Sequence, residues 1–174
     1  YFFILFLKML IYNTQDGYQI NIPTSFHGYD VLKLIGCGST CVVVLIENQI
    51  TKEKYSAKII SKIDAINRNL INAIYREINV LKILTHPNII QLQEYFEINN
   101  EYEDEFIIIV TEYCENGDLL AYITEKGFES ETIKKRIISD FLKAIQYLHQ
   151  QGISHGDIKA ENILLDSNLN AKLC

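Results

Sequence analysis

Apolar and polar residues form short alternating or β-branched runs between residues 29 and 113. Such runs, bounded by glycines or by polar turns, are typical of strands. They read YDVLKLI (29–35), CVVVLIE (41–47), KYSAKII (54–60), QLQEYFE (91–97) and FIIIVTEY (106–113). An acidic loop, INNEYEDE (98–105), joins the last two. The pattern predicts five antiparallel strands in the first part of the chain.

A helical period replaces this alternation in two other stretches. Between about residues 63 and 84, apolar residues recur at spacings of four, four, four and three, at Ile66, Leu70, Ile74, Ile78 and Leu81. This spacing predicts one amphipathic helix, which THPN (85–88) ends. A helical pattern returns with Leu119–Tyr122 and continues through Ile133, Ile137, Phe141, Ile145 and Leu148. The predicted fold class is therefore α+β, with a β-rich part before a helical part.

Composition narrows the class of protein. The chain has 174 residues, and 48% of them are hydrophobic, which is enough for one globular domain or part of one. Its formal net charge of −6 argues against nucleic acid as a partner, because such binding needs clustered Lys and Arg. The four cysteines have no regular spacing, so they indicate reduced thiols in a cytoplasmic protein rather than a metal site.

The first 28 residues receive no function from their sequence. Residues 1–12 are apolar apart from Lys8, but crossing a bilayer takes about 20 residues, so we expect no membrane span. A short buried or membrane-touching segment is the alternative. We interpret residues 1–28 as an N-terminal extension of unknown role.

The stretch GCGSTC (36–41) lies between two predicted strands and allows two interpretations. Glycines at such a place are often only a tight turn. A strand follows instead of a helix, and no Lys-Ser/Thr pair is present, which argues against dinucleotide-binding and Walker A loops. The functional interpretation is a glycine-rich hairpin that folds over phosphate groups.

Lys58 and Glu77 form a candidate ion pair. The helical spacing places Glu77 on the apolar stripe that faces the predicted sheet, and a buried carboxylate needs a partner. Lys58 supplies a cation on the neighbouring predicted strand. The alternative is that Glu77 lies at the edge of the stripe and points into water.

The stretch HGDIKAEN (155–162) combines three side chains that suit phosphoryl transfer. A carboxylate such as Asp157 can orient a hydroxyl nucleophile and accept its proton. A lysine such as Lys159 can neutralise a phosphoryl group, and an amide oxygen such as that of Asn162 can bind a divalent cation.

These stretches occur in the same order as REINVLKILTHPNII and IIIVTEYCENGDL, and together they resemble the protein kinase family. The lysine in DIKAEN is similar to the serine/threonine class, most closely its calmodulin-dependent and AMP-activated branch. The resemblance covers residues 29–174 and implies a partial kinase domain. It would consist of an N-lobe (29–113) with five strands and one helix, a hinge (114–118), and the first helices of the C-lobe (119–174).

The resemblance also implies ATP and Mg²⁺ as cofactors and a protein hydroxyl as the acceptor of the γ-phosphate. Gly36 and Gly38 would let the hairpin approach the ATP phosphates. Lys58 would hold the α- and β-phosphates, and Glu77 would anchor Lys58.

Other residues are expected, by resemblance, to bind the nucleoside. The adenine ring would lie between Val43, Ala57 and Leu164. The backbones of Glu112 and Cys114 would bond the adenine, Thr111 would gate the pocket behind it, and Asp118 would meet the ribose.

In the catalytic loop, the resemblance makes Asp157 the base, Lys159 the γ-phosphate contact and Asn162 a magnesium ligand. Cys41 stands where the family has a third glycine, and Gly156 stands where many kinases have an arginine. The family's Asp-Phe-Gly motif would begin after Cys174, so we expect the 174 residues alone to be inactive. A pseudokinase that binds nucleotide or serves as a scaffold is the alternative function.

Overall fold

The computed structural model describes residues 9–17, 19–99, 105–128 and 130–174. These divide into two units. The first contains the described residues up to Val80 together with Leu92–Glu112, and the second contains Leu81–Gln91 and the described residues from Tyr113 onward. The apolar residues 1–8 and most of the acidic loop lie outside the described part.

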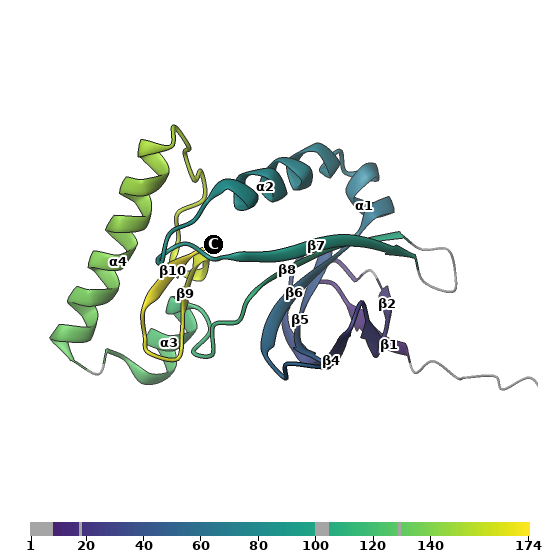
Figure 1. Cartoon of the computed structure of the whole chain (residues 1–174), viewed down its shortest axis with the longest axis horizontal. Coiled ribbons are helices and arrows are strands. Elements are labelled where there is room, and N and C mark those ends of the chain that lie inside the picture. Colours follow the sequence, from purple (N-terminus) through teal and green to yellow (C-terminus); the bar gives the residue numbers. More distant parts are fainter. Residues whose placement is uncertain (1–8, 18, 100–104, 129) are drawn as a thin grey trace, which may run out of the picture. The chain divides into compact units, whose positions relative to one another are not determined.

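A six-stranded antiparallel sheet forms most of the first unit (Figure 1). Its spatial order is β3-β4-β5-β6-β8-β7. The strands are β3 (Ser25–Phe26), β4 (Tyr29–Cys37), β5 (Cys41–Asn48), β6 (Lys54–Ser61), β7 (Leu92–Asn99) and β8 (Glu105–Glu112). The five predicted strands correspond to β4–β8, and the predicted α+β class is confirmed. Strand β3 is a short addition at the edge.

One face of this sheet carries a continuous apolar core. Alternate residues of β5, β6 and β8 point into it, and those of β5 are fully buried at Val42, Val44 and Ile46. The sheet is curled, so residues near its two edges come into contact. The hydroxyl of Tyr29 donates a hydrogen bond to Glu94, and the ring of His27 stacks on Phe96 with 4.1 Å between centroids.

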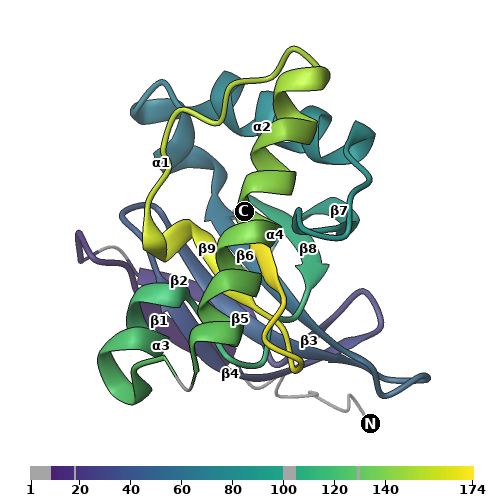
Figure 2. The same cartoon turned by 90° about the vertical axis from the view of Figure 1, so that its left-hand side faces the viewer.

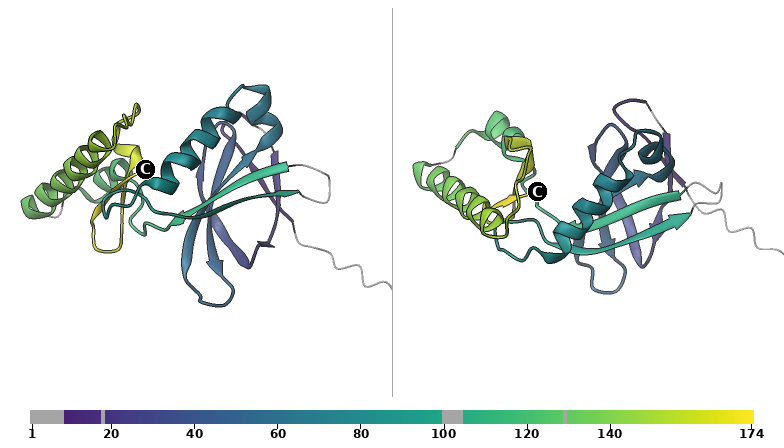
Figure 3. Two further views of the ribbon diagram at one scale, coloured as in Figure 1. Left: turned by 45° about the horizontal axis from the view of Figure 1, so that its top comes forward. Right: turned by 90° about the horizontal axis from the view of Figure 1, so that it is seen from above.

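A hairpin from the N-terminal extension covers part of the same core. Strand β1 (Met9–Asn13) pairs with β2 (Gln19–Pro23) in a separate two-stranded sheet. Ile20 and Ile22 of β2 are fully buried in the core cluster of the six-stranded sheet. Figure 3 shows the purple hairpin beside the strands of the larger sheet. Residues 9–23 are therefore part of the folded first unit.

The single helix predicted over residues 63–84 is wrong, because the structure has two helices there. Helix α1 (Lys62–Asn67) is followed by α2 (Ile71–Ile83). Ser61 caps α1 by accepting a bond from the amide of Asp64. Asn69 then takes a φ of 58°, in the left-handed region that asparagine tolerates better than most residues. The apolar period continues across this break, although the helical backbone does not.

The second unit combines two helices with a small hairpin (Figure 2). Its elements are α3 (Leu119–Lys126), α4 (Glu131–Gln150), the 3₁₀ turn η1 (Ala160–Asn162), β9 (Ile163–Leu165) and β10 (Ala171–Leu173). Strand β10 packs against α4. The buried Asn88 also fixes β10, because its side-chain amide donates to the carbonyl of Ala171 at 3.0 Å. This hairpin positions the loop that precedes it.

Candidate active site

The glycine-rich loop connects β4 and β5 in the first unit. It closes through a hydrogen bond from the amide of Gly38 to the carbonyl of Cys41, at 2.9 Å. A β-carbon at Gly36 would lie 3.3 Å from that of Val43, and one at Gly38 would lie 2.8 Å from the Cys41 sulfur. The two glycines are thus the residues that fit this hairpin best.

Cys41, at the family's third glycine position, packs over Gly38. Burial raises the pKa of its thiol above the ordinary value, and nearby Lys58 opposes this effect only in part. The thiol is therefore neutral at neutral pH, and its bulk explains why position 38 favours glycine.

Lys58 and Glu77 form the predicted ion pair, with 2.9 Å between Nζ and Oε1. Of the two interpretations of Glu77, the structure shows the alternative, in which the carboxylate lies at the edge of the apolar stripe and reaches water. Its side chain is 46% exposed, and that of Lys58 is 36% exposed. Glu77 lies at the edge of the apolar face of α2, whose buried residues are Ile74 and Ile78. The pair is consequently solvated.

The expected role of Ala57 at the adenine needs correction. Lys58 pairs across the sheet with Val43 and Ile109, whereas Ala57 pairs with Val44 and is fully buried in the core. Directly paired residues share a face, and successive residues alternate. Ala57 therefore lies on the face opposite Val43 and Lys58.

Ser56 occupies the face that Ala57 was expected to use. It lies two residues before Lys58, and it pairs with Leu45 on one side and with Thr111 on the other. The sequence could have identified Ser56, because strand alternation alone puts Ser56 and Lys58 on one face.

Thr111 and Glu112 end strand β8 in the first unit, and Cys114 is buried in the second. The segment that follows runs beside β9. The amide of Asn116 bonds the carbonyl of Leu165 at 3.0 Å, and Asp118 bridges to Leu164. The structure therefore brings Asp118 and Leu164 together.

Asp118 has a structural task that the sequence analysis did not assign. Its Oδ1 accepts a hydrogen bond from the amide of Ala121 at 2.8 Å and caps helix α3. The other carboxylate oxygen is the one that could meet a ribose hydroxyl.

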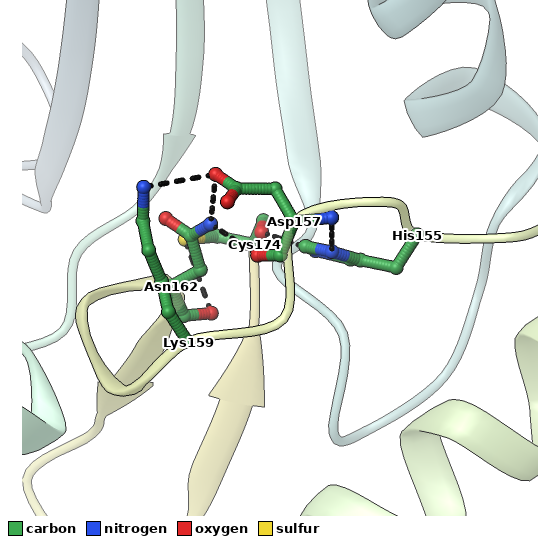
Figure 4. Close-up of polar contacts among 5 residues, drawn as sticks. All are labelled: His155, Asp157, Lys159, Asn162 and Cys174. Atoms are coloured by element: carbon green, nitrogen blue, oxygen red, sulfur yellow. Dashed lines mark hydrogen bonds and ion pairs between the residues drawn. The ribbon is translucent and has the colours of Figure 1, made fainter.

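The structure brings Asp157, Lys159 and Asn162 together in one loop of the second unit (Figure 4). Oδ2 of Asp157 lies 2.9 Å from Nζ of Lys159 and accepts a 2.9 Å bond from Nδ2 of Asn162. The same Nδ2 also donates to the backbone carbonyl of Asp157 at 2.7 Å. These contacts hold the carboxylate in a fixed orientation.

His155 supports the loop from its other side. Its Nδ1 accepts a bond from the amide of Asp157 at 3.2 Å, and its Nε2 lies 2.8 Å from the carbonyl of Cys174. Both contacts fit a ring in which Nδ1 accepts and Nε2 donates. The amide of Cys174 in turn bonds the carbonyl of Asn162 at 3.0 Å. Figure 4 shows this ring of contacts around Asp157.

Electrostatics keep Asp157 ionised. The hydrogen bond from Lys159 is the main cause that lowers the pKa of Asp157, and the bond from Asn162 adds to it. The contact with Asp157 raises the pKa of Lys159 in return. A carboxylate and an ammonium group therefore face each other at neutral pH.

Gly156 has a backbone reason to be glycine. Its φ is +79°, in the left-handed region that side chains with a β-carbon rarely adopt, although no atom would obstruct that β-carbon. Glycine therefore relieves strain directly before Asp157.

The oxygen atoms near Asn162 fit a hard cation such as Mg²⁺. Nδ2 of Asn162 donates its hydrogen bonds to Asp157, so Oδ1 of Asn162 is the side-chain atom left to face a metal. Within the described ranges, no group of three His, Cys, Asp or Glu side chains could hold a metal ion. Asn162 thus offers one oxygen atom that suits such a cation.

The part of the chain that the structure describes contains no helix long and apolar enough to cross a membrane.

Comparison with known proteins agrees with these observations. Residues 29–174 match the model of the protein kinase domain. The chain is 38% identical to mouse serine/threonine-protein kinase SIK1 over 160 residues, which is 92% of this chain and 20% of that protein. It is 37% identical over 145 residues to chicken serine/threonine-protein kinase SIK2 and to kin-29 of Caenorhabditis elegans, with 83% of this chain and 17% of each covered. The chain spans about a fifth of the length of these relatives. The predicted resemblance is confirmed, and the chain belongs to the protein kinase family.

Proposed function

We propose that this chain is part of a serine/threonine protein kinase that transfers the γ-phosphate of ATP to protein hydroxyl groups. The observation that carries the proposal is the loop in which Asp157 contacts both Lys159 and Asn162. The similarity to named serine/threonine kinases supports it.

In the first unit, we assign the phosphates to the glycine-rich loop and to Lys58. Gly36 and Gly38 carry no side chain of their own, so the backbone there can approach a phosphate, although the Cys41 sulfur packs over Gly38. Lys58 would contact the α- and β-phosphates. Glu77 would hold its ammonium group in place, as the 2.9 Å ion pair supports.

The nucleoside contacts follow from the same family resemblance. We assign the adenine faces to Val43 and Leu164, with Ser56 in place of Ala57. We assign the hydrogen bonds to adenine to the backbones of Glu112 and Cys114. Thr111 would border the pocket behind the adenine, and Asp118 would contact the ribose.

In the second unit, we assign proton transfer to Asp157. Its carboxylate would accept the proton of the attacking hydroxyl while that oxygen forms a bond to the γ-phosphorus and the bond to ADP breaks. A positioned base of this kind contributes about 10²–10⁴-fold to the rate. Lys159 would leave Asp157 and neutralise the γ-phosphoryl group.

Magnesium, when bound, would neutralise the phosphate charge, and Oδ1 of Asn162 is the ligand we assign to it. Within the described part of the chain, only this ligand is assigned. We therefore propose that activity requires a longer protein than these 174 residues, which agrees with the match covering only 20% of mouse SIK1. A cytoplasmic location agrees with the thiol form of the four cysteines.

The alternative function is that of a pseudokinase. Its supporting observation is the pair of departures at Cys41 and Gly156, which add bulk at the glycine-rich loop and backbone freedom beside Asp157. The intact Lys58–Glu77 and Asp157–Lys159 pairs favour the enzyme.

Two measurements test the proposal. ATP binding to the 174-residue chain should weaken with Lys58→Met and stay unchanged with the control Lys62→Met, because Lys62 is paired with Glu97 and Glu105. Peptide phosphorylation by the full-length protein should fall about 10²–10⁴-fold with Asp157→Asn and little with Glu161→Gln. ATP binding without any phosphorylation that depends on Asp157 would favour the pseudokinase.

A further inference from the structure

The turn between β1 and β2 lies against the glycine-rich loop. The amide of Gly17 bonds the carbonyl of Thr14 at 3.0 Å, and Gly17 has a φ of +83°. Thr14 is buried, although it is polar. Residues 13–17, here called the N-terminal turn, therefore form an ordered structure at the end of the hairpin.

Two hydrogen bonds join the N-terminal turn to the loop. The amide of Gln15 donates to the carbonyl of Gly38 at 2.9 Å. In the opposite direction, the thiol of Cys37 donates to the carbonyl of Asn13 at 2.9 Å. The turn thus contacts the loop at the second of the two glycines and at the residue between them.

The N-terminal turn is itself firmly anchored. The strand that follows it buries Ile20 and Ile22 completely in the core. On another side, Asp16 forms a 2.8 Å ion pair with Arg68, which ends helix α1. The loop is therefore tied to a turn that the core and α1 hold in place.

The hydrogen bond between Gln15 and Gly38 also sets the direction of the next backbone amide, that of Ser39. Cys37 lies on the core face of the sheet, since it pairs with Val42, so the N-terminal turn that it contacts lies on that side too. In a trans peptide the carbonyl and the next amide point in opposite directions. The carbonyl of Gly38 points to Gln15, so the amide of Ser39 points away from the turn. Because the turn lies on the core face, this amide is directed toward the opposite face of the sheet, on which Val43 and Lys58 lie.

We propose that the N-terminal turn is a positioning element for phosphate binding, which holds the glycine-rich loop so that the Ser39 amide faces the phosphates of ATP. This inference rests on the proposed function for its ligand. It assigns a role to a segment outside residues 29–174, the range that matches the kinase domain. Backbone amides that converge in such a loop are anion donors, and one fixed in advance binds with less loss of conformational entropy.

The test compares variants of Gln15 in the 174-residue chain. Gln15→Pro removes the donating N–H, whereas Gln15→Ala keeps it. Loss of one hydrogen bond should weaken ATP binding about three- to tenfold, and binding of adenosine, which has no phosphates, should stay within about twofold. Titration calorimetry with both ligands gives the comparison. Gln15→Ala should behave as the parent chain.

A second pair of variants guards against misfolding at position 15. Cys37→Ala removes the donor to Asn13, and Cys37→Ser keeps one. Amide hydrogen exchange of residues 39–41, measured without nucleotide, should accelerate about three- to tenfold in Gln15→Pro and Cys37→Ala and remain unchanged in Gln15→Ala and Cys37→Ser.

The outcomes separate this inference from the proposed function. Faster exchange with a loss confined to ATP supports the positioning role. Equal losses for ATP and adenosine, or unchanged exchange in both donor-removing variants, overturn it. If the parent chain binds neither ligand, the proposed function fails, and the exchange measurement still decides whether the turn holds the loop.

Discussion

Among the described ion pairs, Lys58–Glu77 in the first unit and Lys159–Asp157 in the second have equal length but are held by different means. Each has 2.9 Å between nitrogen and oxygen. Lys58 lies in a strand that is bonded to neighbours on both sides and that buries Ala57 and Ile59 in the core. Its position is fixed by apolar packing around the backbone.

The second pair has no such backing. Asp157 and Lys159 are two residues apart in a loop, with side chains 65% and 46% exposed. Polar contacts from His155 and Asn162 fix the loop instead. The first pair thus depends on apolar packing beneath its strand, whereas the second depends on polar contacts within its loop. Substitutions in the apolar core should therefore change the stability of the first unit strongly, and substitutions of polar side chains should have smaller effects.

The largest expected effect is on the apolar support of the first unit. Ile22→Ala, in the N-terminal hairpin, should lower the free energy of unfolding by about 2–5 kcal/mol, because it opens a cavity in the shared core. Ile11→Ala, on the paired strand and 62% exposed, is the matched control and should change it by less than about 0.5 kcal/mol. Urea unfolding measures both. If the two variants were equally stable, the hairpin would not belong to this core.

The sequence predicted the strands of the sheet better than the hairpin that covers it. β-Branched runs make β5 and β8 recognisable, because both are mostly buried. The hairpin was missed, although QINIP alternates polar with apolar residues and Asp16-Gly17 is a turn signal. Its strands are short, and only tertiary burial of Ile20 and Ile22 shows where they belong.

Two other failures have identifiable physical causes. Helical periodicity reports the direction of side chains, and it cannot detect that Asn69 takes a left-handed backbone between α1 and α2. The family resemblance, applied one residue out of register, put Ala57 on the wrong face, which strand alternation could have corrected.

The residues of the loop at 155–162 were predicted from their types, but the contacts that support this loop were not. Asp157, Lys159 and Asn162 were singled out by their residue types at these offsets, and the family resemblance supplied their expected roles. Nothing in the spacing shows that Nδ2 of Asn162 bonds Asp157, or that His155 reaches the carbonyl of Cys174. Such contacts depend on how β9 and β10 return the chain to the loop.

A smaller effect is expected at Asp118, where a polar contact supports the second unit. Asp118→Ala removes the cap of α3 and should lower the free energy of unfolding by about 1 kcal/mol. Asp118→Asn keeps the cap while it removes the charge, so it should preserve stability. Urea unfolding gives the stabilities, and calorimetry gives the affinity for adenosine. An equal loss of stability in both variants would assign the stabilising effect to the charge rather than to the cap.

The Lys58–Glu77 pair should contribute still less to stability, because water screens it. A double-mutant cycle of Lys58→Met and Glu77→Gln should give a coupling energy below about 1 kcal/mol, in place of the 3–5 kcal/mol typical of breaking a buried pair. Lys52→Met combined with Glu77→Gln is the control and should show no coupling, since Lys52 pairs with Glu47. A coupling above about 3 kcal/mol would show that the pair is shielded from water.

The smallest expected effect is a shift in the titration of Asp157. The hydrogen bond from Lys159 is the main cause that lowers its pKa, so Lys159→Met should raise that pKa toward the ordinary value of 3.8. Because the folded chain holds the carboxylate ionised, this contact stabilises the fold above the ordinary pKa. The stabilisation is lost as the pH falls below about 4 and through the lowered pKa. Carboxyl carbon NMR of Asp157 measures the titration directly.

Lys135→Met, which removes a lysine of α4, is the control for a general change in charge and should leave the titration in place. If Lys159→Met left the pKa of Asp157 unchanged as well, Asn162 would be the main support of the carboxylate. In that case the loop would hold the Asp157 carboxylate through a neutral amide, and the ammonium group of Lys159 could contact another anion without any loss to Asp157.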